Sequence, residues 1–138
     1  MDPASIAASA FTLATGIAAC SNTINTFVRQ VKHARKDLEA IDTELNATSE
    51  ILNQLVVNLI GSHNSPLPDP ILAKIEASVC QCKSIVDRLL EDIAHYKRDG
   101  AWNKAKWVLV GEKDAQKARE NLVMHKLSLG LALQVQSL

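Results

Sequence analysis

The sequence has no charged side chain between Asp2 and Arg29. The stretch from Pro3 to Val28 is long enough to cross a bilayer, since a spanning helix needs about 20 predominantly apolar residues. It is rich in alanine, serine, threonine and asparagine, however, whereas a permanent anchor would carry more leucine, isoleucine and valine. We therefore expect a helix that can either pack in a soluble bundle or insert in a membrane. A secretory signal is not expected, because an acidic residue precedes the stretch and hydroxyl side chains dilute it.

Several other absences exclude classes of function. The 15 basic side chains are balanced by 15 acidic ones, so the chain lacks the basic excess that a nucleic-acid partner requires. Its three cysteines form no disulfide framework and have no histidines at metal-ligand spacing, which predicts a reducing, cytoplasmic location and no metal site. The four histidines are scattered and no glycine-rich phosphate loop is present, so we expect no catalytic residue, no cofactor and no enzymatic activity.

Glycine and proline are also scarce, with five and four residues, and aromatic residues make up only 4% of the chain. The alternation typical of strands is absent, and the aliphatic residues instead recur in steps of three and four. The pattern predicts a single all-α domain over residues 1–138, folded as an antiparallel bundle of four long helices plus one short helix.

The first two helices are marked by their starts and their apolar spacing. Asp2 is a good N-cap and Pro3 a good first helical residue. Apolar periodicity continues without a phase break to Ile60, which would allow one long helix. We favour a hairpin with its bend near residues 32–35, because a single rod could not bury its own apolar face.

The remaining boundaries follow from glycine and proline. The segment Gly61–Pro70 is predicted to be a loop, and a third helix is expected to start at Asp69 and Pro70 and to end at Gly100. A short amphipathic helix is expected from Ala101, ending at Gly111. A last helix should run from Glu112 almost to the end of the chain.

The first helix also carries the predicted site. Its insertion and packing face is formed by Ile6, Ala8, Leu13, Gly16, Ile17, Ile24 and Phe27. A row of small residues at Ala8, Thr12, Gly16 and Cys20 has the spacing that allows close helix approach in membranes, although alanine-rich sequence also produces such rows without an assembly role.

Basic residues directly follow the uncharged stretch. Arg29, Lys32, Arg35 and Lys36 are expected either to contact anionic lipid headgroups or to form a solvated turn balanced by the acids that follow. Trp102 and Trp107 are expected to be bundle anchors, and the alternative is an interfacial patch with the neighbouring lysines.

Three stretches resemble the N-terminal domain of fungal STAND (NOD-like receptor) proteins of the HeLo-like family. They read MDPASIAASAFTLATGI, KDLEAIDTELNATSEILNQL and KRDGAWNKAKWVLVGEKDAQKARENLVMHKLSLGLAL. The third stretch, with Trp102, Trp107 and Gly111, is the most specific. Members often have a proline where this chain has Arg35, which supports a bend there.

The resemblance implies an N-terminal signalling domain of an innate-immunity-type receptor, followed by further receptor domains. Related HeLo and HeLo-like domains trigger regulated cell death, with self-association and insertion of the N-terminal helix into the plasma membrane. An alternative expectation is a helical protein–protein interaction module, adaptor or autoinhibitory, that has no membrane activity.

Overall fold

The computed structural model of the chain describes residues 2–61, 67–98 and 111–136. These residues form four long helices and one 3-10 turn: α1 (Pro3–Gln30), η1 (Lys32–Ala34), α2 (Arg35–Ile60), α3 (Asp69–Arg98) and α5 (Glu112–Gln136). No strand occurs among them, so the all-α prediction is confirmed. Residues 101–110 of the predicted short helix, with Trp102 and Trp107, lie outside the described residues.

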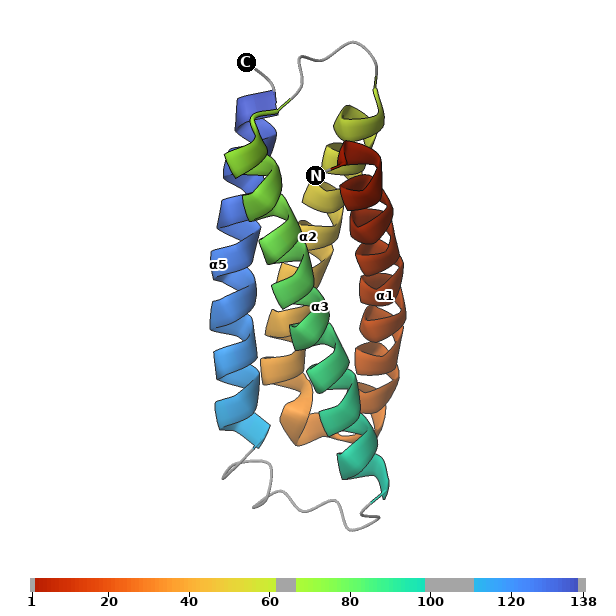
Figure 1. Ribbon diagram of the computed structural model, residues 1–138. Coiled ribbons are helices and arrows are strands. Elements are labelled where there is room, and N and C mark those ends of the chain that lie inside the picture. The colour runs from red at the N-terminus through yellow and green to blue at the C-terminus, as the bar shows by residue number, and fades with distance from the viewer. Residues whose placement is uncertain (1, 62–66, 99–110, 137–138) are drawn as a thin grey trace.

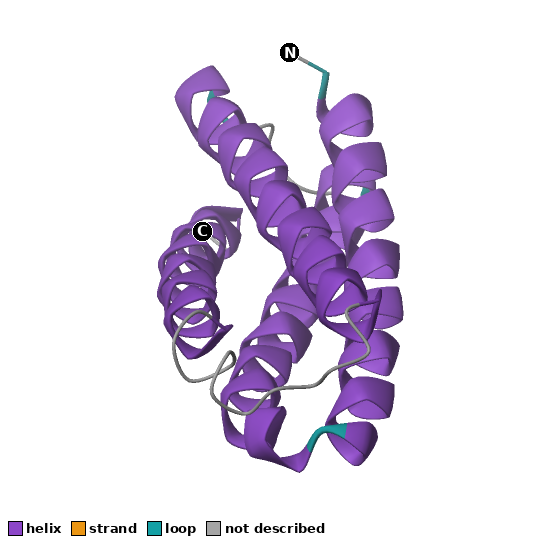
Figure 2. Cartoon of the chain, turned by 90° about the horizontal axis from the view of Figure 1, so that it is seen from below, coloured by secondary structure: helices purple, strands orange, loops and turns teal. Residues whose placement is uncertain are grey.

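The helices form a bundle in which each packs against two others (Figure 1). Around the bundle the order is α1, α2, α5, α3, so α1 and α5 lie at opposite corners, as Figure 2 shows from below. Helices that follow one another in the chain run in opposite directions, as expected. Two pairs of spatial neighbours nevertheless run parallel, α1 with α3 and α2 with α5 (Figure 1).

The core is built from the predicted apolar stripes. All four helices contribute fully buried aliphatic side chains, among them Ile17, Leu52, Ile75 and Leu129. Such positions lie three or four residues apart along each helix, so each helix turns one continuous face inward. The polar contacts across the core are few and specific. Lys126 of α5 donates to Glu44 of α2 at 2.7 Å, and both side chains are largely buried.

The helix boundaries follow local chemistry. Asp2 caps α1 by accepting a hydrogen bond from the backbone N–H of Ala4 at 3.1 Å, and Pro3 occupies the first turn. The possibility of a single helix from Pro3 to Ile60 is wrong, because the backbone leaves the helical region at Val31 and turns through η1 into α2. The bend therefore lies where the hairpin interpretation placed it.

Candidate functional site

Helix α1 has one buried face that joins it to the bundle. Ile6, Leu13, Ile17, Ile24 and Phe27 are each at most 3% exposed. They pack against α2 on one side and α3 on the other. These five members of the predicted packing face are therefore covered in this structure.

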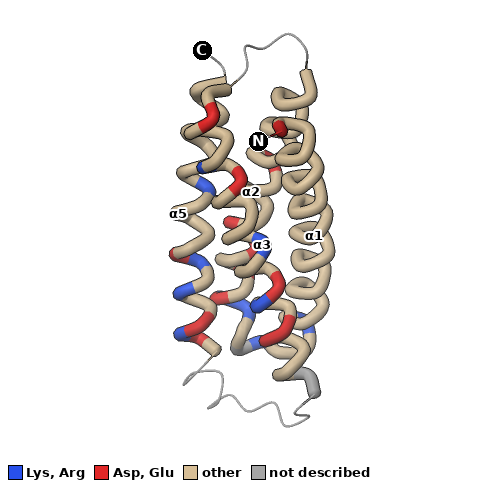
Figure 3. Tube along the Cα trace, in the orientation of Figure 1, with Lys and Arg blue, Asp and Glu red and all other residues tan. Residues whose placement is uncertain are grey.

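Between Pro3 and Val28, the opposite face of α1 is open to solvent and carries no charge. Its exposed residues are Ala4, Ser5, Ala8, Ser9, Phe11, Thr12, Thr15, Ala18, Ala19, Asn22, Asn25 and Thr26. Figure 3 shows the contrast with the other helices, along which basic and acidic residues are distributed. By length and composition alone, helix α1 could cross a membrane: an 18-residue window of it has a mean hydropathy of 1.5, and 39% of that window is buried.

The threonines of α1 are already satisfied within the helix. The hydroxyl groups of Thr12, Thr15, Thr23 and Thr26 each donate to the carbonyl oxygen four residues earlier, at 2.9 to 3.1 Å. A hydroxyl bonded in this way does not need water as a partner. The free-energy cost of placing these hydroxyl groups in lipid is therefore lower than their number alone suggests.

The contacts that hold α1 in the bundle differ from those between α2 and α5. Ser21 of α1 donates a hydrogen bond to a carboxylate oxygen of Asp42 in α2. No ion pair joins α1 to another helix within the part of the chain that the structure describes. The α2–α5 interface, in contrast, contains the Glu44–Lys126 ion pair. Apolar packing is thus the main attachment of α1.

The small-residue row does not mediate close packing in this structure. Ala8 and Thr12 are exposed, Gly16 is partly exposed, and Cys20 is buried. A Cβ atom added at Gly16 would meet nothing within 4 Å. The bundle therefore does not require glycine at this position.

The predicted basic residues lie together at the end of α1 and the start of α2. Arg29, Lys32, Arg35 and Lys36 are all exposed. Arg35 forms an exposed ion pair with Glu39, 3.4 Å between Nε and the carboxylate. This surface is available both to water and to an anionic headgroup, so both interpretations remain predictions.

The cysteines divide into two buried residues and one exposed residue. Burial raises the pKa of Cys20 to about 12, with a further contribution from the negative charge of Asp42, and burial alone raises that of Cys82 to about 12. Cys80 is exposed. No group of three or more potential metal ligands occurs among the described residues.

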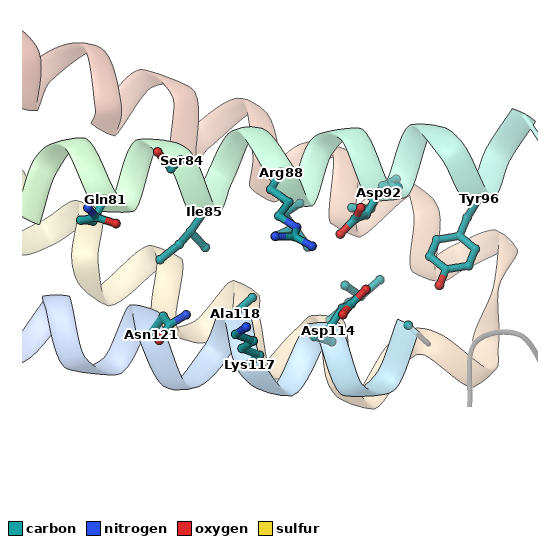
Figure 4. A pocket seen from close by; sticks show the side chains of 15 residues that line it. Gln81, Ser84, Ile85, Arg88, Asp92, Tyr96, Asp114, Lys117, Ala118 and Asn121 are labelled. Atoms are coloured by element: carbon teal, nitrogen blue, oxygen red, sulfur yellow. The ribbon is translucent and has the colours of Figure 1, made fainter. Parts of the chain in front are cut away.

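A cavity of about 220 Å³ lies between α3 and α5 and was not anticipated from the sequence. Its apolar lining includes Leu38, Leu89, Ile93 and Ala115, and charged side chains stand around its opening (Figure 4). The sequence signal that could have indicated this cavity is a pair of oppositely charged residues at helical spacing on each helix, Arg88 and Asp92 on α3 and Asp114 and Lys117 on α5. Such pairs are common on solvated surfaces, and only the packing of α3 against α5 brings them together.

The chain belongs to the family described as "Pigment biosynthesis cluster protein PigL N-terminal", whose model matches residues 1–137. No curated protein and no solved structure matches it. The family description mentions neither receptors nor cell death.

Proposed function

We propose that this domain of the PigL N-terminal family is a membrane-targeting effector module whose α1 helix leaves the bundle and inserts in a bilayer after self-association. In this function it is the N-terminal signalling domain of a larger fungal receptor and triggers regulated cell death. The observation that carries the proposal is the absence of charge from the whole circumference of α1 between Pro3 and Val28, including the face that water covers.

The proposed switch exchanges the partners of one helix. In the closed bundle the apolar face of α1 is covered by α2 and α3. In the inserted state lipid or neighbouring copies cover the same residues, so the apolar surface is never left in water. Most of the attachment consists of packing that lipid can replace. The Ser21–Asp42 hydrogen bond must break, which costs about 0.5 to 1.5 kcal/mol, or somewhat more for a charged acceptor.

The basic residues at the end of α1 fit the same model. Once α1 has inserted, Arg29 and Lys32 lie at its membrane–water boundary. Each basic side chain near an anionic leaflet contributes about 1 kcal/mol. The model therefore predicts a preference for anionic plasma-membrane lipids.

The test is permeabilisation of dye-loaded anionic vesicles by residues 1–138, in solution and clustered through a fused oligomerisation tag. We expect release only from the clustered protein, and less release from neutral vesicles. Expression of the tagged domain in yeast should give plasma-membrane fluorescence and death. A clustered, folded protein that neither binds nor permeabilises these vesicles would refute the proposal.

The alternative function, a helical interaction module without membrane activity, is favoured by the outer face of α5. This face exposes four large apolar side chains at helical spacing, namely Met124, Leu127, Leu131 and Val135. If two copies associate through this face, the double variant Leu127→Glu/Leu131→Glu will be monomeric by light scattering where the parent chain is dimeric. If oligomerisation is unchanged in that variant, this surface is not the contact.

A further inference from the structure

The charges around the α3–α5 cavity are arranged in two opposed pairs. Helix α3 supplies Arg88 and Asp92, four residues apart, and α5 supplies Asp114 and Lys117, three residues apart. In Figure 4, Asp92 and Asp114 face each other across the cavity, and further along the two helices Arg88 extends into the gap from α3 while Lys117 lies opposite it on α5. Like charges thus stand on opposite sides of the opening. The acidic residues Asp92 and Asp114 lie toward one end of it, and the basic residues Arg88 and Lys117 lie next to them along the helices.

These four side chains do not neutralise one another by direct contact. Within the described ranges none of them has an ion pair within 4 Å or a hydrogen bond. Burial, and next the negative charge of Asp114, raise the pKa of Asp92, while Arg88 lowers it in part. The two carboxylates therefore repel each other, and a cation between them would relieve that repulsion.

We propose that this cavity binds a small zwitterion whose anionic and cationic groups lie about one helical turn apart, of the phosphoethanolamine class. The Cβ atoms of residues three or four positions apart on a helix are about 5 to 6 Å apart. A phosphate placed between Arg88 and Lys117 would leave an ammonium on a two-carbon chain between Asp92 and Asp114. Both ends would then make charge-assisted hydrogen bonds. The buried apolar lining faces the connecting carbons.

The dimensions discriminate among small zwitterions. In an α-amino acid the two charged groups are attached to the same carbon, so it cannot reach both pairs together. Inorganic phosphate or ethylamine can satisfy only one pair and leaves the other repulsion in place. Helix α1 does not line the cavity, so the site is independent of the proposed membrane function.

The experiment is a titration of the 138-residue chain with phosphoethanolamine to about 10 mM, followed by backbone amide NMR. We expect saturable shifts in α3 and α5, at least tenfold weaker binding of glycine, phosphate and ethylamine, and a loss of at least tenfold in affinity for Arg88→Gln and for Asp92→Asn. Lys83→Gln, which removes an exposed cation of α3 that is outside the cavity lining, is the matched control and should bind normally.

A phosphoethanolamine group could reach the cavity as part of a lipid headgroup or as a free metabolite, and titration with glycerophosphoethanolamine distinguishes these two sources. Binding of this diester as well as the monoester indicates a lipid headgroup, and binding of the monoester alone indicates a free metabolite. Either result supports the site. The proposal is overturned if phosphoethanolamine gives no saturable shift, if phosphate alone binds as tightly, or if binding survives in the Arg88→Gln/Asp92→Asn double variant with its fold intact.

Discussion

Replacement of Gly16 by glutamate separates the folding of the bundle from insertion of α1. Gly16 lies near the middle of the uncharged stretch, and a Cβ atom there would meet no atom within 4 Å beyond the local backbone of its own helix. The folded bundle should therefore accept the new side chain without a clash. Because glycine inside a helix costs about 0.5 to 1 kcal/mol relative to alanine, the free energy of unfolding should stay unchanged or rise slightly.

In the proposed inserted state the same substitution has the opposite effect. A charged side chain at the centre of a spanning helix costs about 2.5 to 3.5 kcal/mol on insertion scales. At about 1.4 kcal/mol for each factor of ten, this penalty lowers the insertion equilibrium by about 60-fold to 300-fold. We expect dye release from anionic vesicles to be lost at protein concentrations at which the parent chain is active.

Two control variants make the result specific. Gly16→Ala has the same gain in helix propensity without a charge and should retain release. Asn46→Glu adds the same charge at an exposed position of α2 and should also retain it. Thermal unfolding of all variants verifies that they are folded. If Gly16→Glu releases dye as the parent does, the centre of α1 does not enter the bilayer and the proposed mechanism is wrong.

Three further predictions test the bundle itself. Lys126→Met leaves the largely buried carboxylate of Glu44 without its partner, so urea denaturation should show a loss of about 2 kcal/mol, and no loss would mean that the pair is not formed in solution. Leu52→Ala removes a fully buried side chain outside α1; it should cost about 2 to 5 kcal/mol and increase vesicle binding, whereas decreased binding by folded protein would contradict a closed resting state. Cys80 alone should react with a thiol reagent at pH 8 in the native protein, because it is the exposed cysteine. The pKa values of Cys20 and Cys82 are raised in the folded state, so the unfolded chain loses these protons first. The free energy of unfolding should therefore fall as pH rises from about 9 towards 12.

The helices themselves were predictable because their signals are local. An acid followed by proline marks the start of α1, and apolar residues at steps of three and four define the buried face of each helix. The predicted start of the last helix at Glu112, directly after Gly111, is also confirmed. The bend near residues 32–35 had a weaker signal, since periodicity alone permitted a continuous helix.

The arrangement of the helices was less predictable because it depends on residues far apart in the chain. Glu44 and Lys126 pair across the α2–α5 interface, and Ser78 and Ser128 across the α3–α5 interface. Nothing in either helix alone identifies its neighbour, and the apolar stripes would fit several orders around the bundle. The parallel α2–α5 pair and the α3–α5 cavity both follow from this order, so neither could be read from spacing.

The strongest argument for a second state of α1 comes from positions where burial imposes no constraint. A buried residue must be apolar in any bundle, so the inner face of α1 is explained by folding alone. An exposed position on a soluble helix can carry any polar side chain, and charged ones occur on α2 up to Glu50, along α3, and on α5 up to Lys126 (Figure 3). Between Pro3 and Val28 of α1, the fully exposed positions hold only alanine, serine, threonine, asparagine and Phe11. The closed bundle gives no physical reason to exclude lysine or glutamate there, whereas a bilayer around α1 would exclude both.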